Sequence, residues 1–130
     1  MTPLTLVLLP DTFTIHRLPP ATPLPETLYR SNFFSITQSA DELSIVCEST
    51  IKIDSRKQEE GWSCLRVEGV LDFDLTGILA DLSGILAEAG ISLFAISTYD
   101  TDYLLVKTET LTDAVAALRD AGHTVQNKHA

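Results

Sequence analysis

Two aspartates, Asp100 and Asp102, stand in a short polar stretch that interrupts an otherwise apolar part of the chain. The stretch runs from Ser97 to Asp102 and reads STYDTD, and we call it the acidic turn. It contains no Lys or Arg that could neutralise its carboxylates. One interpretation is a polar hairpin turn, because Asp and Thr side chains favour turns by bonding to nearby backbone. The other is a binding site whose aspartates receive an ammonium or a basic side chain of a ligand. The residues alone leave both open.

A second stretch, LDFDLTG from Leu71 to Gly77, joins a predicted strand to a predicted helix. The free backbone N–H groups and the dipole of a helix N-terminus favour an anion such as a carboxylate. Thr76 adds a hydroxyl, and Gly77 has no side chain to block an approach. The alternative is an ordinary turn in which Asp74 caps the helix. The glycine patterns of phosphate-binding loops are absent from the sequence.

These two stretches would suit a zwitterion if the fold brought them together. The α-carboxylate would then bind the backbone N–H groups, and the ammonium would bind Asp100 or Asp102. Whether the stretches approach each other depends on how the chain's modules pack.

Catalysis and metal binding are not predicted. Cys47 and Cys64 fall in apolar, strand-like segments, and neither has a histidine close in sequence that could activate it. The three histidines are scattered without the spacing of metal ligands. We therefore expect no enzyme activity, no metal and no cofactor. Two buried thiols in a reduced chain also predict a cytoplasmic location.

The composition restricts the partners. The chain has 130 residues, 45% of them hydrophobic, and a net charge of −9. This length fits one ordinary domain or two very small ones that share a core. The acidic balance argues against nucleic acid and against anionic membrane surfaces. No apolar run approaches the roughly 18 residues of a membrane span.

The second half of the chain has the clearer pattern, and its order β-α-β-β-α-β predicts a ferredoxin-like α+β fold. Apolar residues at three- and four-residue steps predict two helices, the first from a cap at Asp74 to Gly90 and the second over Leu111–Ala121. Gly77 and Gly84 in the first helix suggest a close approach of backbone to a neighbour. The expected strands read WSCLRVEG, ISLFAIS, DYLLVK and HTVQ.

The first half is less regular and carries a partial repeat of the second. Strands are expected at residues 4–9 and 13–18 with a turn at Pro10 and Asp11, then an extended segment, a helical turn around Glu26–Arg30, and a strand pair at 33–38 and 43–48. Residues 33–50 align without gaps on residues 93–110, at an offset of 60. We therefore predict two tandem modules, an abbreviated one at 1–60 and a complete one at 61–130.

The segment VLDFDLTGILADLSGILAEAGISLFAIST resembles the start of an ACT domain, and FAISTYDTDYLLV sharpens the likeness. The chain is similar to short bacterial tandem-ACT proteins related to CASTOR-type arginine sensors and to aspartokinase regulatory domains. It departs from them in two ways: the sensors have four modules, and many ACT domains carry Pro where Thr76 stands. The resemblance implies an amino acid bound between two modules. Together with the acidic turn, it gives these predicted ligand-binding residues: Ser44, Ile45, Asp72, Phe73, Asp74, Leu75, Thr76, Thr98, Tyr99, Asp100 and Asp102.

The expected function is therefore a non-catalytic ACT-domain protein that binds a free amino acid and regulates a separate partner protein. The resemblance also implies a homodimer, because ACT modules commonly pair their sheets. The alternative is an interaction or oligomerisation module whose ligand pocket is vestigial.

Overall fold

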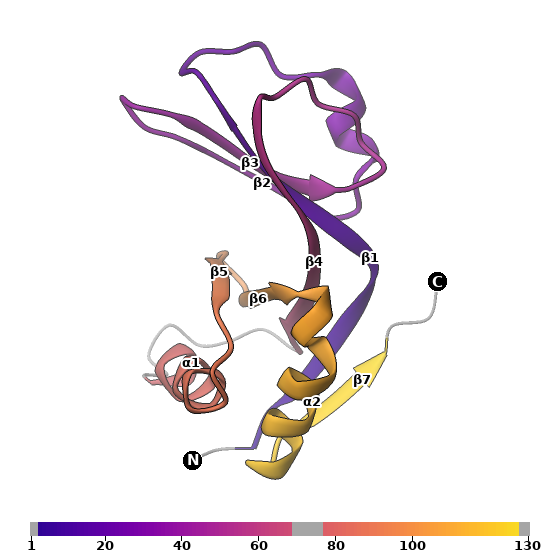
Figure 1. Ribbon diagram of the computed structural model, residues 1–130, viewed down its shortest axis with the longest axis vertical. Helices are drawn as coiled ribbons and strands as arrows, with labels where there is room; N and C mark the ends of the chain where they lie inside the picture. The colour runs from indigo at the N-terminus through magenta and orange to yellow at the C-terminus, as the bar shows by residue number, and fades with distance from the viewer. Residues whose placement is uncertain (1–2, 69–76, 128–130) are drawn as a thin grey trace. The chain divides into compact units, whose positions relative to one another are not determined.

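The computed structural model describes residues 3–68 and 77–127. The chain divides into two compact units (Figure 1). Unit 1 comprises Met1–Pro10 and Ser63–Ala130, and unit 2 comprises Asp11–Trp62. Two long strands, β1 (Thr5–Leu18) and β4 (Lys57–Val67), run from one unit into the other. The predicted ligand-binding residues Asp72–Thr76, with the proposed cap Asp74, lie outside the described residues.

Unit 1 is a mixed α+β unit consistent with the ACT-like ferredoxin fold. Its strands lie in the order β5-β6-β4-β1-β7, in which β5 and β6 are antiparallel and β7 is parallel to β1. Two helices pack side by side (Figure 1). Besides β1 and β4, its elements are α1 (Ile78–Glu88), β5 (Leu93–Ser97), β6 (Asp102–Lys107), the 3₁₀ turn η2 (Thr108–Thr110), α2 (Leu111–Asp120) and β7 (Thr124–Asn127).

The two helices end as the sequence predicts. Gly90 follows α1 with φ +75°, and Gly122 follows α2 with φ +100°, a left-handed backbone that glycine adopts without strain. The suggested close approach at Gly77 and Gly84 is not observed, because no described atom lies within 4 Å of a Cβ built at either position. Gly77 has a different reason to be glycine, since its φ is +82° where α1 begins.

The core of unit 1 lies between the helices and one face of the strands. The helices contribute three fully buried residues to this core: Leu82 and Leu86 of α1 and Leu118 of α2. The strands contribute alternate residues, as the period of two requires. The strand members of this cluster are Leu6, Leu65, Val67, Leu104, Val106 and Val125.

Unit 2 contains parts of β1 and β4, two further strands and no α-helix. The order is β2-β3-β1, and β4 is the next neighbour of β1 in the sheet. A small core of Leu18, Leu28, Leu43, Ile45, Cys47 and Ile51 lies on one face of these strands. The elements not yet given are the 3₁₀ turn η1 (Glu26–Arg30), β2 (Phe34–Gln38) and β3 (Leu43–Glu48), all close to the predicted positions.

The predicted turn at Pro10 and Asp11 is wrong, because β1 is a single strand of 14 residues. Its residues Thr5–Leu8 pair with β7, and Phe13–Leu18 pair with β3. Pro10 falls between these two registers, so its missing N–H leaves neither ladder incomplete.

The β2–β3 hairpin and the β5–β6 hairpin have turns of the same length, but the residues of the two turns correspond at an offset of 59 and not 60. The Ser39 N–H donates to the Glu42 carbonyl, and the Thr98 N–H donates to the Thr101 carbonyl. A shift of one residue exchanges the two faces of a strand. The ungapped alignment of the sequence therefore pairs residues that point to opposite faces of the two hairpins.

Among the described residues, no helix is long and apolar enough to cross a membrane.

Candidate functional site

The acidic turn closes the β5–β6 hairpin of unit 1. Ser97 pairs with Asp102, and the Thr98 N–H donates to the Thr101 carbonyl over 2.8 Å. Tyr99 and Asp100 form the tip, where the Tyr99 side chain is 81% exposed. The stretch is thus a tight hairpin turn, and Ser97, Thr98, Tyr99 and Asp100 are exposed in it.

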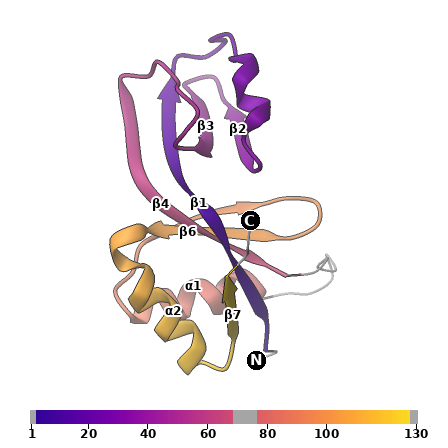
Figure 2. The same ribbon diagram turned by 90° about the vertical axis from the view of Figure 1, so that its right-hand side faces the viewer.

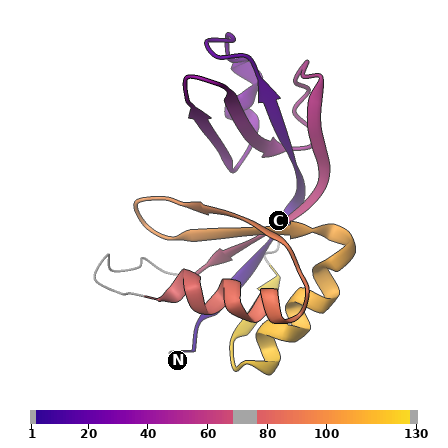
Figure 3. The same cartoon turned by 60° about the vertical axis from the view of Figure 1, so that its left-hand side comes forward.

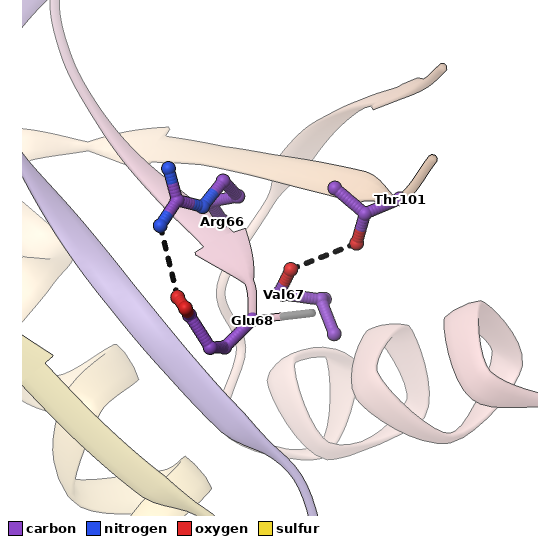
Figure 4. A network of polar contacts seen from close by, with 4 residues as sticks. All are labelled: Arg66, Val67, Glu68 and Thr101. Atoms are coloured by element: carbon purple, nitrogen blue, oxygen red, sulfur yellow. Dashed lines mark hydrogen bonds and ion pairs between the residues drawn. The ribbon is translucent and has the colours of Figure 1, made fainter. Parts of the chain in front are cut away.

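The carboxylates of the acidic turn are not neutralised by the rest of the described chain. The Ser97 hydroxyl donates to Oδ1 of Asp102 over 2.6 Å, which orients that carboxylate but leaves its charge in place. Neither Asp100 nor Asp102 forms an ion pair with another described residue. Arg66 of β4 is paired instead with Glu68, at 2.9 Å (Figure 4). The turn therefore presents negative charge, as a site for an ammonium requires.

A buried hydrogen bond ties the acidic turn to the end of β4. The Thr101 hydroxyl donates to the Val67 carbonyl over 2.8 Å, and Thr101 is only 7% exposed (Figure 4). Val67 is the last residue of β4, and the chain continues from there toward α1. The hairpin tip and the first turn of α1 lie at the same end of unit 1 (Figures 2 and 3). A ligand at this end could therefore contact both the acidic turn and the N-terminal end of α1.

Ser44 and Ile45 occupy different environments in β3 of unit 2. Ile45 is 1% exposed and belongs to the core of that unit, so its side chain is occupied by packing. Ser44 is half-buried and pairs with Arg17 and Thr37 in the strand ladders, which places it on the opposite face. Of these two predicted contacts, only Ser44 has a side chain outside the core.

Sequence reasoning missed a polar pocket within unit 2. It is lined by Thr14, Ser49, Ile51, Lys52, Ile53, Asp54, Gln58 and Glu60 and has a volume of about 380 Å³. The signal was present in β1, where the alternating residues Thr14 and His16 place polar groups on a face shared with Ile45 and Cys47. Only the pairing with β3 shows that this face carries the core of unit 2.

Neither cysteine has the properties of a nucleophile. Burial raises the pKa of Cys47 to about 11 and that of Cys64 to about 12. Both thiols are therefore protonated at neutral pH, and both are shielded from reagents.

We expect neither thiol to react with a disulfide reagent within minutes at pH 8 in the native protein. Two thiols per chain should react rapidly after unfolding in guanidinium chloride. The measurement is the absorbance of the released thiolate, with free cysteine as the rate standard. Fast labelling of either cysteine in the native state would contradict the buried, protonated state described above.

The mixed α+β fold of unit 1 is consistent with an ACT domain, and the comparisons with known proteins agree. A family model described as an ACT domain matches residues 57–120, beginning at the first residue of β4. A second model, described as an N-terminal domain, matches residues 11–52 within unit 2. Among curated proteins, none matches the chain significantly.

Solved structures extend the likeness to the whole chain. A protein from Agrobacterium tumefaciens is 36% identical, with a TM-score of 0.91 over 100% of this chain and 97% of that one. Residues 57–120 of the chain are therefore an ACT domain, and the chain is a relative of this bacterial protein over nearly the whole of both chains. The ligand-free regulatory subunit of aspartate kinase from Thermus thermophilus shares the fold, with a TM-score of 0.66, 11% identity and coverage of 93% and 99% of the two chains. A Vibrio cholerae protein also shares the fold, with a TM-score of 0.68, 20% identity and coverage of 90% and 88% of the two chains.

Proposed function

We propose that this chain is a non-catalytic ACT-domain regulator that binds a free amino acid and acts on a separate protein. The observation that supports this most is the acidic turn, whose two aspartates have no ion-pair partner among the described residues and which is held at the end of β4 by Thr101. The chain's structural likeness to the regulatory subunit of aspartate kinase also supports a regulatory role.

In this proposal the ligand's ammonium, or a basic side chain, binds Asp102 or Asp100. Ser97 holds Asp102 through its hydroxyl, so the carboxylate loses little rotational freedom when a ligand arrives. Thr98 and Tyr99 provide further contacts at the tip. Residues Asp72–Thr76, which follow β4 in sequence, are proposed to receive the carboxylate.

We further propose two tandem ACT-like modules, an abbreviated one at residues 1–60 and a complete one at 61–130, in a cytoplasmic homodimer. Of the two residues predicted in the N-terminal module, we keep Ser44 as a proposed ligand contact, because the Ile45 side chain is packed in the core of unit 2. Strand β5 ends the strand order of unit 1, and such edges favour pairing with a second chain. Sedimentation equilibrium tests this: a single species of 14.2 kDa over the micromolar range would rule out a stable homodimer.

A ligand regulates a partner only through different affinities for two states of the protein. Binding to the acidic turn would supply such a difference by adding an ammonium to a turn that carries two carboxylates. The partner would then distinguish the ligand-bound turn from the free one.

A thermal-shift screen against the twenty amino acids tests the proposal. A ligand at about 100 times its Kd adds about 2.7 kcal/mol to the free energy of unfolding, which is several degrees for a chain of this size. We expect one chemical class to give this shift, and Asp102→Asn to weaken it by about 10-fold to 100-fold in affinity, because a charged hydrogen bond is lost. The amide of Asn still accepts from Ser97, so the turn should persist.

Glu88→Gln is the matched control, since it removes one exposed carboxylate from the same unit away from the turn. An unchanged response in Asp102→Asn would place the ligand elsewhere. A flat screen would instead favour the interaction or oligomerisation module, whose pocket is vestigial.

A further inference from the structure

Unit 2 contains a pocket that the proposed function does not use. Its eight lining residues all lie within Thr14–Glu60, so the pocket belongs to this unit alone. Its volume of about 380 Å³ falls in the range of small-molecule sites, about 300–1,000 Å³. The lining consists of Thr14 of β1, five residues within 49–54 after β3, and Gln58 and Glu60 of β4.

Buried polar groups lie on the face of β1 that borders the pocket. Thr14 is 4% exposed, and its hydroxyl lies 2.8 Å from the Ser49 hydroxyl. His16 is 3% exposed and lies on the same face of β1 as Thr14, two residues away. Burying such groups in an apolar face costs free energy unless each finds a partner. Departures of this kind from an apolar pattern concentrate at functional sites.

A line of polar contacts connects His16 to the pocket wall. Nδ1 of His16 lies 2.7 Å from the Ser55 hydroxyl, which donates to Gln58 Oε1 over 3.4 Å. The Gln58 amide donates in turn to Glu60 Oε1 over 3.4 Å. Nε2 of His16 is buried and has no hydrogen-bond partner among the described residues. Burial lowers the pKa of His16, with the nearby Glu60 carboxylate opposing, so the ring is neutral at pH 7.

The charges of the lining indicate the ligand's chemistry. Lys52 carries an ammonium, while Asp54 and Glu60 carry carboxylates. A simple anion would meet two like charges, and a simple cation would leave Lys52 without a counter-charge from the ligand. A molecule that carries one positive and one negative charge can bind Lys52 and a carboxylate of the lining at the same time. Hydroxyls at Thr14 and Ser49 and aliphatic surface at Ile51 and Ile53 suit a short polar or aliphatic body.

We infer that the pocket lined by Thr14, Ser49, Lys52, Asp54 and Glu60 in unit 2 is a second ligand site, which binds a small zwitterion such as a free amino acid. Lys52 binds its carboxylate, and Asp54 or Glu60 binds its ammonium. This site is separate in sequence from the acidic turn, and each can fail without the other.

The test is a nuclear magnetic resonance titration of the full chain with each of the twenty amino acids, followed by amide shifts. We expect at least one amino acid to shift amides within residues 49–60. Lys52→Met and Glu60→Gln should each raise its Kd by about 10-fold or more at these amides. The matched controls Lys57→Met and Glu59→Gln, which alter residues outside the lining, should leave the Kd unchanged.

Asp102→Asn separates the two proposals, because it should leave the shifts at residues 49–60 intact. The inference is overturned if no amino acid moves these amides, or if the lining variants and the controls behave alike. It is also overturned if every shift disappears in Asp102→Asn, which would support the acidic turn alone. Putrescine and succinate provide the final comparison: equal binding of either one would overturn the assignment to a zwitterion. Spectra with the dispersion of the parent protein confirm that each variant is folded.

Discussion

Leu86→Ala is expected to lower the free energy of unfolding by about 3 kcal/mol, within the roughly 2–5 kcal/mol found for such truncations. Leu86 lies on α1, is fully buried and belongs to the core cluster of unit 1. Its removal leaves a cavity that the neighbouring strands and α2 fill only in part, since packed cores relax little. Denaturation in urea, followed by circular dichroism and by the fluorescence of Trp62, measures the change.

Leu24→Ala is the matched control, because Leu24 is 47% exposed and outside both cores. It should change the free energy of unfolding by less than about 0.5 kcal/mol. A loss below about 1 kcal/mol in Leu86→Ala would contradict the placement of α1 over the strands of unit 1.

Thr101→Val is expected to cost about 1–3 kcal/mol, the usual penalty for leaving a buried polar group without its partner. Valine has nearly the same shape but cannot donate to the Val67 carbonyl. The acidic turn would then lose its attachment to the end of β4, so we also expect any amino-acid response of the turn to weaken. Urea denaturation measures the first effect, and the thermal-shift response measures the second.

Thr101→Ser keeps the hydroxyl and should retain most of both properties. Thr98→Val serves as a second comparison, because the Thr98 hydroxyl bonds only within the turn, to Thr101, and Thr98 is exposed. Equal stability of Thr101→Val and Thr98→Val would show that the bond to Val67 contributes nothing specific. An undiminished ligand response in Thr101→Val would show that ligand binding does not depend on the hydrogen bond to Val67.

Much of the local structure could be predicted because it depends on short-range patterns. Leu82 and Leu86 follow the helical period that predicts α1, and Gly90 and Gly122 mark the ends of the two helices. A hairpin turn was one of the two interpretations that the polar composition of the acidic turn left open, and the pairing of β5 with β6 shows that the turn is a hairpin. The absence of a basic residue within it was also visible. That Arg66 pairs with Glu68 and not with the acidic turn required the structure, because the acidic turn lies far from β4 in the chain.

The sequence by itself determined the helices, the two hairpins and the ACT-domain character, since each follows from periodicity or from a motif within a few tens of residues. The tertiary structure alone decided that β1 runs unbroken past Pro10, and that β7 pairs with a strand almost 120 residues away. It also decided that Thr14 and His16 face the core side of unit 2, where Thr14 lines a pocket. Such pairings depend on which distant strands share a ladder, and a local pattern specifies only that a strand exists and which residues lie on each of its faces.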